Sequence, residues 1–319
     1  MKRWLWSLLL VFVVLLCGAA VTFYLAPIAV SDAAVRFHLW RSGVHSRYVN
    51  VDGNRIHFFD APARSAQPGK PLLLVHGLGA RGEDWAPMIP ALAAQGFHVY
   101  ALDLLGYGRS ARPDVVYSIA LEEKTVVDFM RAVGLNRADV AGWSMGGWVA
   151  LKLAADHPML VDRLVVYDAA GIYFPPTFAD SLFTPHDAAG LEQLQVMLSP
   201  HPVALPDFVQ RAVVRRLRSN AWVIQRSLSA MKNGRDLLDF QLQNISRPTL
   251  IVWGADDRLI PPSVGETMHR EISGSNLLLV EGCGHLTPSE CAPPVVAATA
   301  RFLHAEPPVV GGKETVAGK

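Results

Sequence analysis

The sequence Gly-Trp-Ser-Met-Gly-Gly at residues 142–147 constrains the fold of this chain more than any other segment. It follows the pattern G-x-S-x-G, with apolar residues before it and a run of good helix formers after it. This arrangement predicts a sharp turn from a buried strand into a helix, with Ser144 at the turn. Small residues on both sides of the serine leave room for a strained backbone. The hydroxyl of Ser144 would then project from a helix N-terminus, where negative charge is favoured.

The rest of the chain alternates short apolar segments with helical ones. We expect strands at residues 47–51, 55–59, 72–75, 98–102, 138–141, 164–167, 249–253 and 277–280, and helices at 85–95, 121–133, 145–157, 263–272 and 295–303. Short apolar strands separated by helices predict an α/β fold with a mostly parallel central sheet flanked by helices. The alternation stops between residues 171 and 245, which contain several prolines and mixed helical segments. We interpret this segment as an inserted helical cap.

The N-terminus carries a second strong signal. Lys2 and Arg3 are followed by no charged residue until Asp32, and residues 4–26 are almost entirely apolar. As a helix, that segment would be about 34 Å long, enough to cross a hydrocarbon core of about 30 Å. We therefore predict a single-pass membrane anchor within residues 1–30, with the folded domain on the non-cytoplasmic side. The alternative is a signal peptide that is cleaved near residues 18–20, followed by secretion.

Composition and spacing set further limits. A chain of 319 residues that is 51% hydrophobic can bury a large core. We expect a linker helix at residues 31–46, one folded domain at 47–305 and a disordered tail at 306–319. The net charge of +1 argues against a nucleic-acid partner, and the oligomeric state is left open. Cys283 and Cys291 are expected to be unpaired thiols, with a disulfide as the alternative in an oxidising compartment.

A serine nucleophile needs a base to take its proton and an acid to orient that base. His285 and Asp257 are candidates, because each lies in a Gly-containing loop directly after a predicted strand. The carboxyl ends of parallel strands share one edge of a sheet, so both side chains are expected near Ser144. Asp256 and Asp168 are alternative acids, the first by adjacency and the second because it ends another predicted strand.

These features together resemble the α/β-hydrolase family over about residues 47–304. The resemblance rests on His-Gly-Leu-Gly at 76–79, Asp-Leu-Leu-Gly-Tyr-Gly-Arg-Ser at 103–110, the turn at Ser144, and the loops with Asp257 and His285. It implies a catalytic triad of Ser144, His285 and Asp257, in the chain order of the family. It also implies an oxyanion hole made by the backbone N–H groups of Leu78 and Met145.

Two further residues take structural roles from the same resemblance. His76 is expected to shape the oxyanion loop, and Asp103 is expected to stabilise a neighbouring loop. No metal-binding spacing of the CxxC or HExxH type occurs. The implied chemistry therefore needs neither a metal nor an organic cofactor.

The resemblance implies a serine hydrolase that cleaves carboxylic esters through an acyl-enzyme. A membrane anchor makes the chain similar to monoacylglycerol lipase-like esterases, so we expect apolar ester or lipid substrates and a membrane partner. One alternative is a C–C bond hydrolase of meta-cleavage products, although those enzymes usually carry Trp where this chain has Leu286. Cofactor-free haloperoxidases or perhydrolases are another alternative, and a catalytically inactive binding protein is a remote one.

A basic segment in the expected cap is not explained by catalysis. Arg211, Arg215, Arg216 and Arg218 lie close together, and positions 211, 215 and 218 share one helical face. That face could meet anionic lipid headgroups near the anchor. The alternative interpretation is a solvated helix surface.

Overall fold

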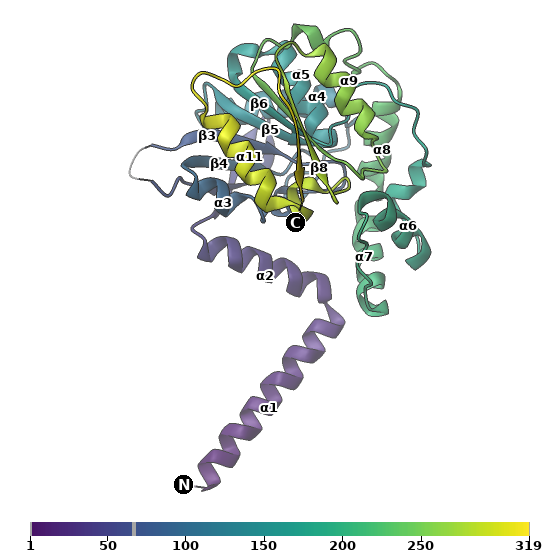
Figure 1. Ribbon diagram of the computed structural model, residues 1–319. Coiled ribbons are helices and arrows are strands. Elements are labelled where there is room, and N and C mark those ends of the chain that lie inside the picture. The colour runs from purple at the N-terminus through teal and green to yellow at the C-terminus, as the bar shows by residue number, and fades with distance from the viewer. Residues whose placement is uncertain (1, 66–67, 319) are drawn as a thin grey trace.

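The computed structural model describes residues 2–65 and 68–318 (Figure 1). Met1, Ala66, Gln67 and Lys319 lie outside this description. The described strands form one sheet in the order β1-β2-β4-β3-β5-β6-β7-β8-β9. Their bounds are β1 His45–Val51, β2 Asn54–Ala61, β3 Lys70–Val75, β4 Phe97–Leu102, β5 Ala138–Trp143, β6 Val161–Tyr167, β7 Thr249–Gly254, β8 Asn276–Glu281 and β9 Lys313–Ala317.

The sheet is mostly parallel and is covered on both faces. Strands β3 to β9 pair in parallel, whereas β2 is antiparallel to β1 and β4. The central strands are almost wholly buried, as a sheet with two covered faces requires. One face packs against α3 (Ile89–Ala94) and α11 (Ala292–His304), and the other against α4 (Ile119–Ala132), α5 (Met145–Asp156) and α9 (Pro262–Glu271). The predicted α/β fold is thus confirmed.

Two expectations about individual segments are wrong. The chain does not form one helix at 85–95 but a 3₁₀ turn at Gly82–Trp85 followed by the short α3. Pro87 and Pro90 lack the N–H groups that a continuous helix would use there. The tail at 306–319 is not wholly irregular, because its residues 313–317 form β9 and pair with β8. The open edge of β8 offers backbone N–H and C=O groups that an extended segment can satisfy.

Residues 171–245, all of them described, contribute no strand to the sheet. They contain a 3₁₀ turn at Asp180–Phe183 and the helices α6 (Ala188–Leu198), α7 (Asp207–Ser219) and α8 (Ala221–Lys232). These helices lie at the right of the sheet domain in Figure 1. Because the segment leaves the sheet after β6, it starts at the edge where the site candidates are found.

Two helices precede the sheet. The first, α1 (Lys2–Leu25), projects away from the domain, and its residues Trp4–Leu25 are long and apolar enough to cross a membrane (Figure 1). Pro27 starts α2 (Pro27–Arg41), which begins four residues before the expected linker helix. Leu39 of α2 is buried in the core, whereas Phe37 and Trp40 are 56% and 65% exposed.

Candidate active site

Ser144 lies at the turn between β5 and α5, where its φ of +57° is unusual for a residue with a side chain. The neighbouring glycines are required by close backbone contacts. A Cβ on Gly142 would lie 2.1 Å from the carbonyl oxygen of Gly146, and a Cβ on Gly146 would lie 2.2 Å from that of Val75. The two glycines of the G-x-S-x-G pattern are therefore required because a side chain at either position would collide with neighbouring backbone atoms.

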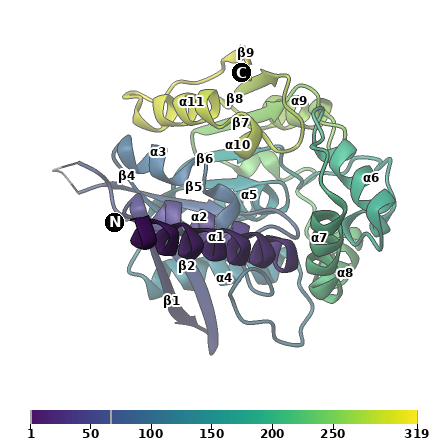
Figure 2. The same ribbon diagram turned by 90° about the horizontal axis from the view of Figure 1, so that it is seen from below.

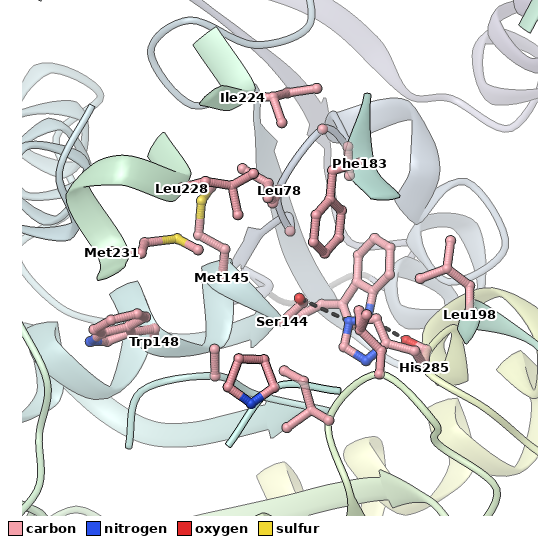
Figure 3. Close-up of a pocket in the computed structure, with 18 of the residues that line it drawn as sticks. Leu78, Ser144, Met145, Trp148, Phe183, Leu198, Ile224, Leu228, Met231 and His285 are labelled. Atoms are coloured by element: carbon pink, nitrogen blue, oxygen red, sulfur yellow. Dashed lines mark hydrogen bonds between the residues drawn. The ribbon is translucent and has the colours of Figure 1, made fainter. Parts of the chain in front are cut away.

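The structure brings Ser144, His285 and Asp257 together, and Figure 3 shows the contact between Ser144 and His285. The Nε2 atom of His285 lies 2.9 Å from Oγ of Ser144, and its Nδ1 atom lies 2.8 Å from Oδ2 of Asp257. An ionised carboxylate can only accept hydrogen bonds, so Nδ1 carries the proton and Nε2 is free to accept the serine hydroxyl. His285 and Asp257 are both buried. This geometry suits proton transfer from the serine to the imidazole.

Asp257 is held in a fixed orientation. Its Oδ1 atom accepts the backbone N–H groups of Leu259 at 2.8 Å and Ile260 at 3.0 Å, which leaves Oδ2 for His285. Burial lowers the pKa of His285, but the charge and hydrogen bond of Asp257 outweigh it, so the pKa lies above its ordinary value. The alternative acid Asp256 is exposed.

Asp168, the other alternative acid, lies at the end of β6 and links the loops that carry Asp257 and His285. Its carboxyl group accepts the N–H of Gly254 at 2.8 Å and contacts the hydroxyl of Thr287 at 2.5 Å. Burial, together with the nearby negative charge of Asp257, raises the pKa of Asp168 to about 7. The position of Asp168 therefore suits a connection between the two loops.

The expected oxyanion-hole residues line the same cavity as Ser144. Met145 is the first residue of α5, so its N–H has no acceptor within the helix. Leu78 follows Gly77, whose backbone packs against the serine: a Cβ on Gly77 would lie 3.0 Å from Cβ of Ser144. Both positions are compatible with donors to an oxygen anion formed beside Ser144.

His76 and Asp103 lie behind the candidate oxyanion loop and bind the backbone. His76 is fully buried, donates from Nδ1 to the carbonyl oxygen of Gly77 at 2.8 Å, and accepts the N–H of Leu104 at 3.0 Å. Burial lowers the pKa of His76, which favours the neutral ring that this pairing requires. Asp103 accepts the N–H of Arg109 at 2.8 Å. The hydrogen bonds of His76 and Asp103 therefore stabilise the backbone of the candidate oxyanion loop and of the loop that follows β4.

Sequence reasoning did not find the bonds that position the loop of His285. The indole N–H of Trp143 donates to the carbonyl oxygen of His285 at 2.7 Å. The N–H of His285 donates to the carbonyl oxygen of Leu198, at the end of α6, at 2.8 Å. These bonds join residues far apart in sequence, so no local pattern signals them.

Cys283 and Cys291 form a disulfide, so the expectation of two unpaired thiols is wrong. The short helix α10 (Thr287–Glu290) turns the chain back after His285 and brings the two Cα atoms to 6.4 Å. The disulfide therefore closes the loop that carries the candidate base.

A cavity of about 600 Å³ opens beside Ser144 and His285. Its wall is mainly apolar and comes largely from the segment between β6 and β7, including Phe183, Leu198, Ile224, Leu228 and Met231 (Figure 3). Lys232 is the one Lys or Arg among the described lining residues, and it forms an ion pair with Asp180 at 3.0 Å. A cavity of this size and polarity suits a small apolar ligand.

No candidate metal centre accompanies the cavity. Within residues 2–65 and 68–318, no group of three or more His, Cys, Asp or Glu side chains could hold a metal ion. Ser144 and His285 are among the polar residues that line the cavity, and they contact each other there.

Comparison with known proteins agrees with this architecture. The family model described as alpha/beta hydrolase fold matches residues 70–290. The chain therefore belongs to the α/β-hydrolase family, as the resemblance implied. Among curated relatives, a 2-hydroxymuconate semialdehyde hydrolase of Pseudomonas putida is 31% identical over 74% of this chain and 87% of its own length. The monoacylglycerol lipase abhd6-B of Xenopus laevis is 26% identical over 79% of this chain and 81% of its own length.

Solved structures add a membrane protein to the relatives. A membrane phospholipase A, described as a bacterial virulence factor, superposes with a TM-score of 0.78 at 27% identity. The match covers 95% of this chain and 98% of that protein. A serine hydrolase involved in carbazole degradation superposes with a TM-score of 0.68 at 26% identity, over 82% of this chain and 98% of that one.

Proposed function

We propose that this chain is a serine esterase acting on apolar acyl substrates, with Ser144 as nucleophile, His285 as base and Asp257 as orienting acid. The observation that carries the proposal is His285, which lies 2.9 Å from Ser144 and 2.8 Å from Asp257 and lines an apolar cavity together with Ser144. Oγ of Ser144 attacks the ester carbonyl carbon while Nε2 of His285 takes the hydroxyl proton.

The backbone N–H groups of Leu78 and Met145 then stabilise the oxygen anion of the tetrahedral intermediate, and each such donor is commonly worth about 3–4 kcal/mol. His285 returns the proton to the leaving alcohol, and an acyl group remains on Ser144. A water molecule, deprotonated by His285, attacks this acyl-enzyme, and His285 then returns that proton to Oγ of Ser144 as the acid leaves. Every proton step uses Nε2, so one base serves both halves of the reaction.

We further propose that α1 anchors the enzyme in a membrane with the folded domain on the non-cytoplasmic side. Three observations support this proposal. Trp4–Leu25 is apolar and contains no buried residue, a relative with a similar fold is a membrane phospholipase A, and a disulfide is typical of an oxidising compartment. The anchor would hold the cavity near a reservoir of lipid esters.

C–C bond hydrolysis is the second candidate, because relatives include hydrolases of 2-hydroxymuconate semialdehyde and of a dienoic acid. An acid substrate is an anion at neutral pH and needs a cationic partner when buried. Among the described residues that line the cavity, Lys232 is the one Lys or Arg, and Asp180 already neutralises it. The cavity therefore favours a neutral ester.

Hydrolysis of p-nitrophenyl esters from acetate to palmitate by the full chain tests the proposal. We expect turnover that favours medium or long acyl chains, and a loss of at least about 10³-fold in Ser144→Ala. Ser263→Ala, an exposed serine on α9, is the matched control and should keep the wild-type rate. Equal rates for Ser144→Ala and the wild type would rule out the serine-esterase assignment.

A further inference from the structure

The cap helix α7 lies next to the end of the apolar helix α1. The ring of Phe208, in the first turn of α7, lies 5.6 Å from that of Phe23 and 5.0 Å from that of Tyr24. Both partners are within the last three residues of α1. Figures 1 and 2 agree that α7 lies beside the end of α1. If α1 crosses a bilayer, these three aromatic rings lie at its interface, where aromatic residues are enriched.

The two faces of α7 differ in chemistry. Ala212 and Val214 are buried, and Leu217 lines the cavity. Arg211, Arg215 and Arg218 are exposed on the outer face, one or two turns apart. We call these three residues the basic face.

The basic face has no ion-pair partner among the described residues. Arg216, by contrast, points to α2 and pairs with Asp32 at 3.4 Å. Asp32 also forms an ion pair with Arg81 at 2.6 Å, so Arg81 and Arg216 together neutralise its negative charge. Asp207 is the one acidic residue in α7. The basic face therefore presents uncompensated positive charge beside the membrane-proximal end of the molecule.

We propose that the basic face of α7 is a docking surface for the anionic phospholipid headgroups of the bilayer that α1 enters. The proposal rests on the membrane anchor of the proposed function. Opposite charge and continuity with the aromatic cluster at Phe208 identify the partner. Because Leu217 belongs to the same helix, headgroup binding would hold one wall of the cavity against the lipid surface.

Hydrogen exchange on the full chain in lipid nanodiscs tests this proposal without relying on catalysis. One set of discs contains phosphatidylcholine alone, and the other contains phosphatidylglycerol as well. We expect backbone amides of α7 to exchange several-fold more slowly in the anionic discs, and about 0.5 M NaCl to remove the difference because it screens exposed charges. Soluble glycerol phosphate added to the neutral discs should not reproduce the effect.

The variant Arg211→Gln/Arg215→Gln/Arg218→Gln should lose the lipid-dependent difference. The control variant Arg131→Gln/Arg137→Gln/Arg301→Gln removes the same charge from exposed positions outside α7 and should keep it. Thermal melting of both variants checks folding. Equal exchange of α7 in the two lipids, an equal loss in both variants, or an effect of glycerol phosphate would overturn the proposal. Ester hydrolysis is measured separately, so a failure of the esterase assignment is distinguishable.

Discussion

At the scale of single residues, the protonation state of His285 controls the proposed reaction. Its Nε2 atom must be neutral to accept the proton of Ser144, and the Asp257 carboxylate holds the pKa of the imidazole above its ordinary value of 6.5. The inactive imidazolium therefore persists to a higher pH than in a free histidine. We expect kcat/KM to fall as the pH is lowered, with an apparent pKa above about 6.5.

A pH profile of ester hydrolysis measures this value directly. In Asp257→Asn the imidazolium loses its anionic partner, so the apparent pKa should move down. An unchanged midpoint in that variant would mean that a group other than His285 limits the rate.

The choice among acids is also a question of single residues. Asp257→Asn should lower kcat by about 10³–10⁴-fold, because the amide no longer selects the productive tautomer of His285. Asp168→Asn should lower kcat by less than about tenfold, since an amide can still accept from Gly254 and donate to the Thr287 hydroxyl. Steady-state kinetics on one soluble ester compare the two. A larger loss in Asp168→Asn would reassign the acid.

At the scale of elements, the loop after β8 is fixed by contacts from three directions. The indole N–H of Trp143 donates to the carbonyl oxygen of His285, and the N–H of His285 donates to the carbonyl oxygen of Leu198 in α6. The disulfide joins the two ends of the loop. A Cβ on Gly284 would lie 2.6 Å from the carbonyl oxygen of Leu198, so the loop also needs glycine there. The position of the candidate base thus depends on the cap as well as on the sheet.

Removing the disulfide tests the role of this closure. For a loop of this length, Cys283→Ser/Cys291→Ser should lower the free energy of unfolding by about 2–3 kcal/mol. We also expect a lower kcat with a nearly unchanged KM, because the loop carries the base and contributes less of the apolar wall. Thermal melting and ester kinetics measure both effects. Cys17→Ser, at a free and exposed thiol on α1, is the control and should match the wild type.

The pattern of apolar segments was sufficient to predict the interior strands from the sequence, because a strand covered on both faces is apolar along its length. The same pattern did not predict β9, because its sequence Lys-Glu-Thr-Val-Ala is mainly polar and exposed. This strand forms because β8 offers an open edge with which it can pair. The pattern was also insufficient for residues 85–95, where two prolines divide a segment of helical composition. In both segments, a specific feature determines the secondary structure rather than the average composition: the open edge of β8 in one and the two prolines in the other.

At the scale of the whole molecule, α2 connects the apolar helix to the domain. Asp32 of α2 binds Arg81, just after the candidate oxyanion loop, and Arg216 of the cap helix α7. Leu39 of α2 is fully buried in the core. The end of α1 is therefore held near the cap by contacts that involve both the sheet domain and α7.

We predict that the full chain behaves as an integral membrane protein. It should remain in the membrane fraction after carbonate extraction, and its intact mass should include the N-terminal segment. Replacing Leu10 and Val14 with Arg should shift it toward the soluble fraction, since each charge at a helix centre costs about 2.5–3.5 kcal/mol of insertion energy. A soluble wild-type product shorter by about twenty N-terminal residues would instead identify a signal peptide.

Features whose causes are local could be predicted from the residues alone. The turn at Ser144 follows from its glycines, the parallel sheet follows from apolar strands alternating with helices, and the candidate triad follows from residues at strand ends. The folded structure was needed to establish which carboxylate contacts His285, that Cys283 and Cys291 pair, and that the first turn of α7 lies beside the end of α1. These features depend on contacts between residues brought together by loops and by the cap, and local periodicity carries no information about such contacts.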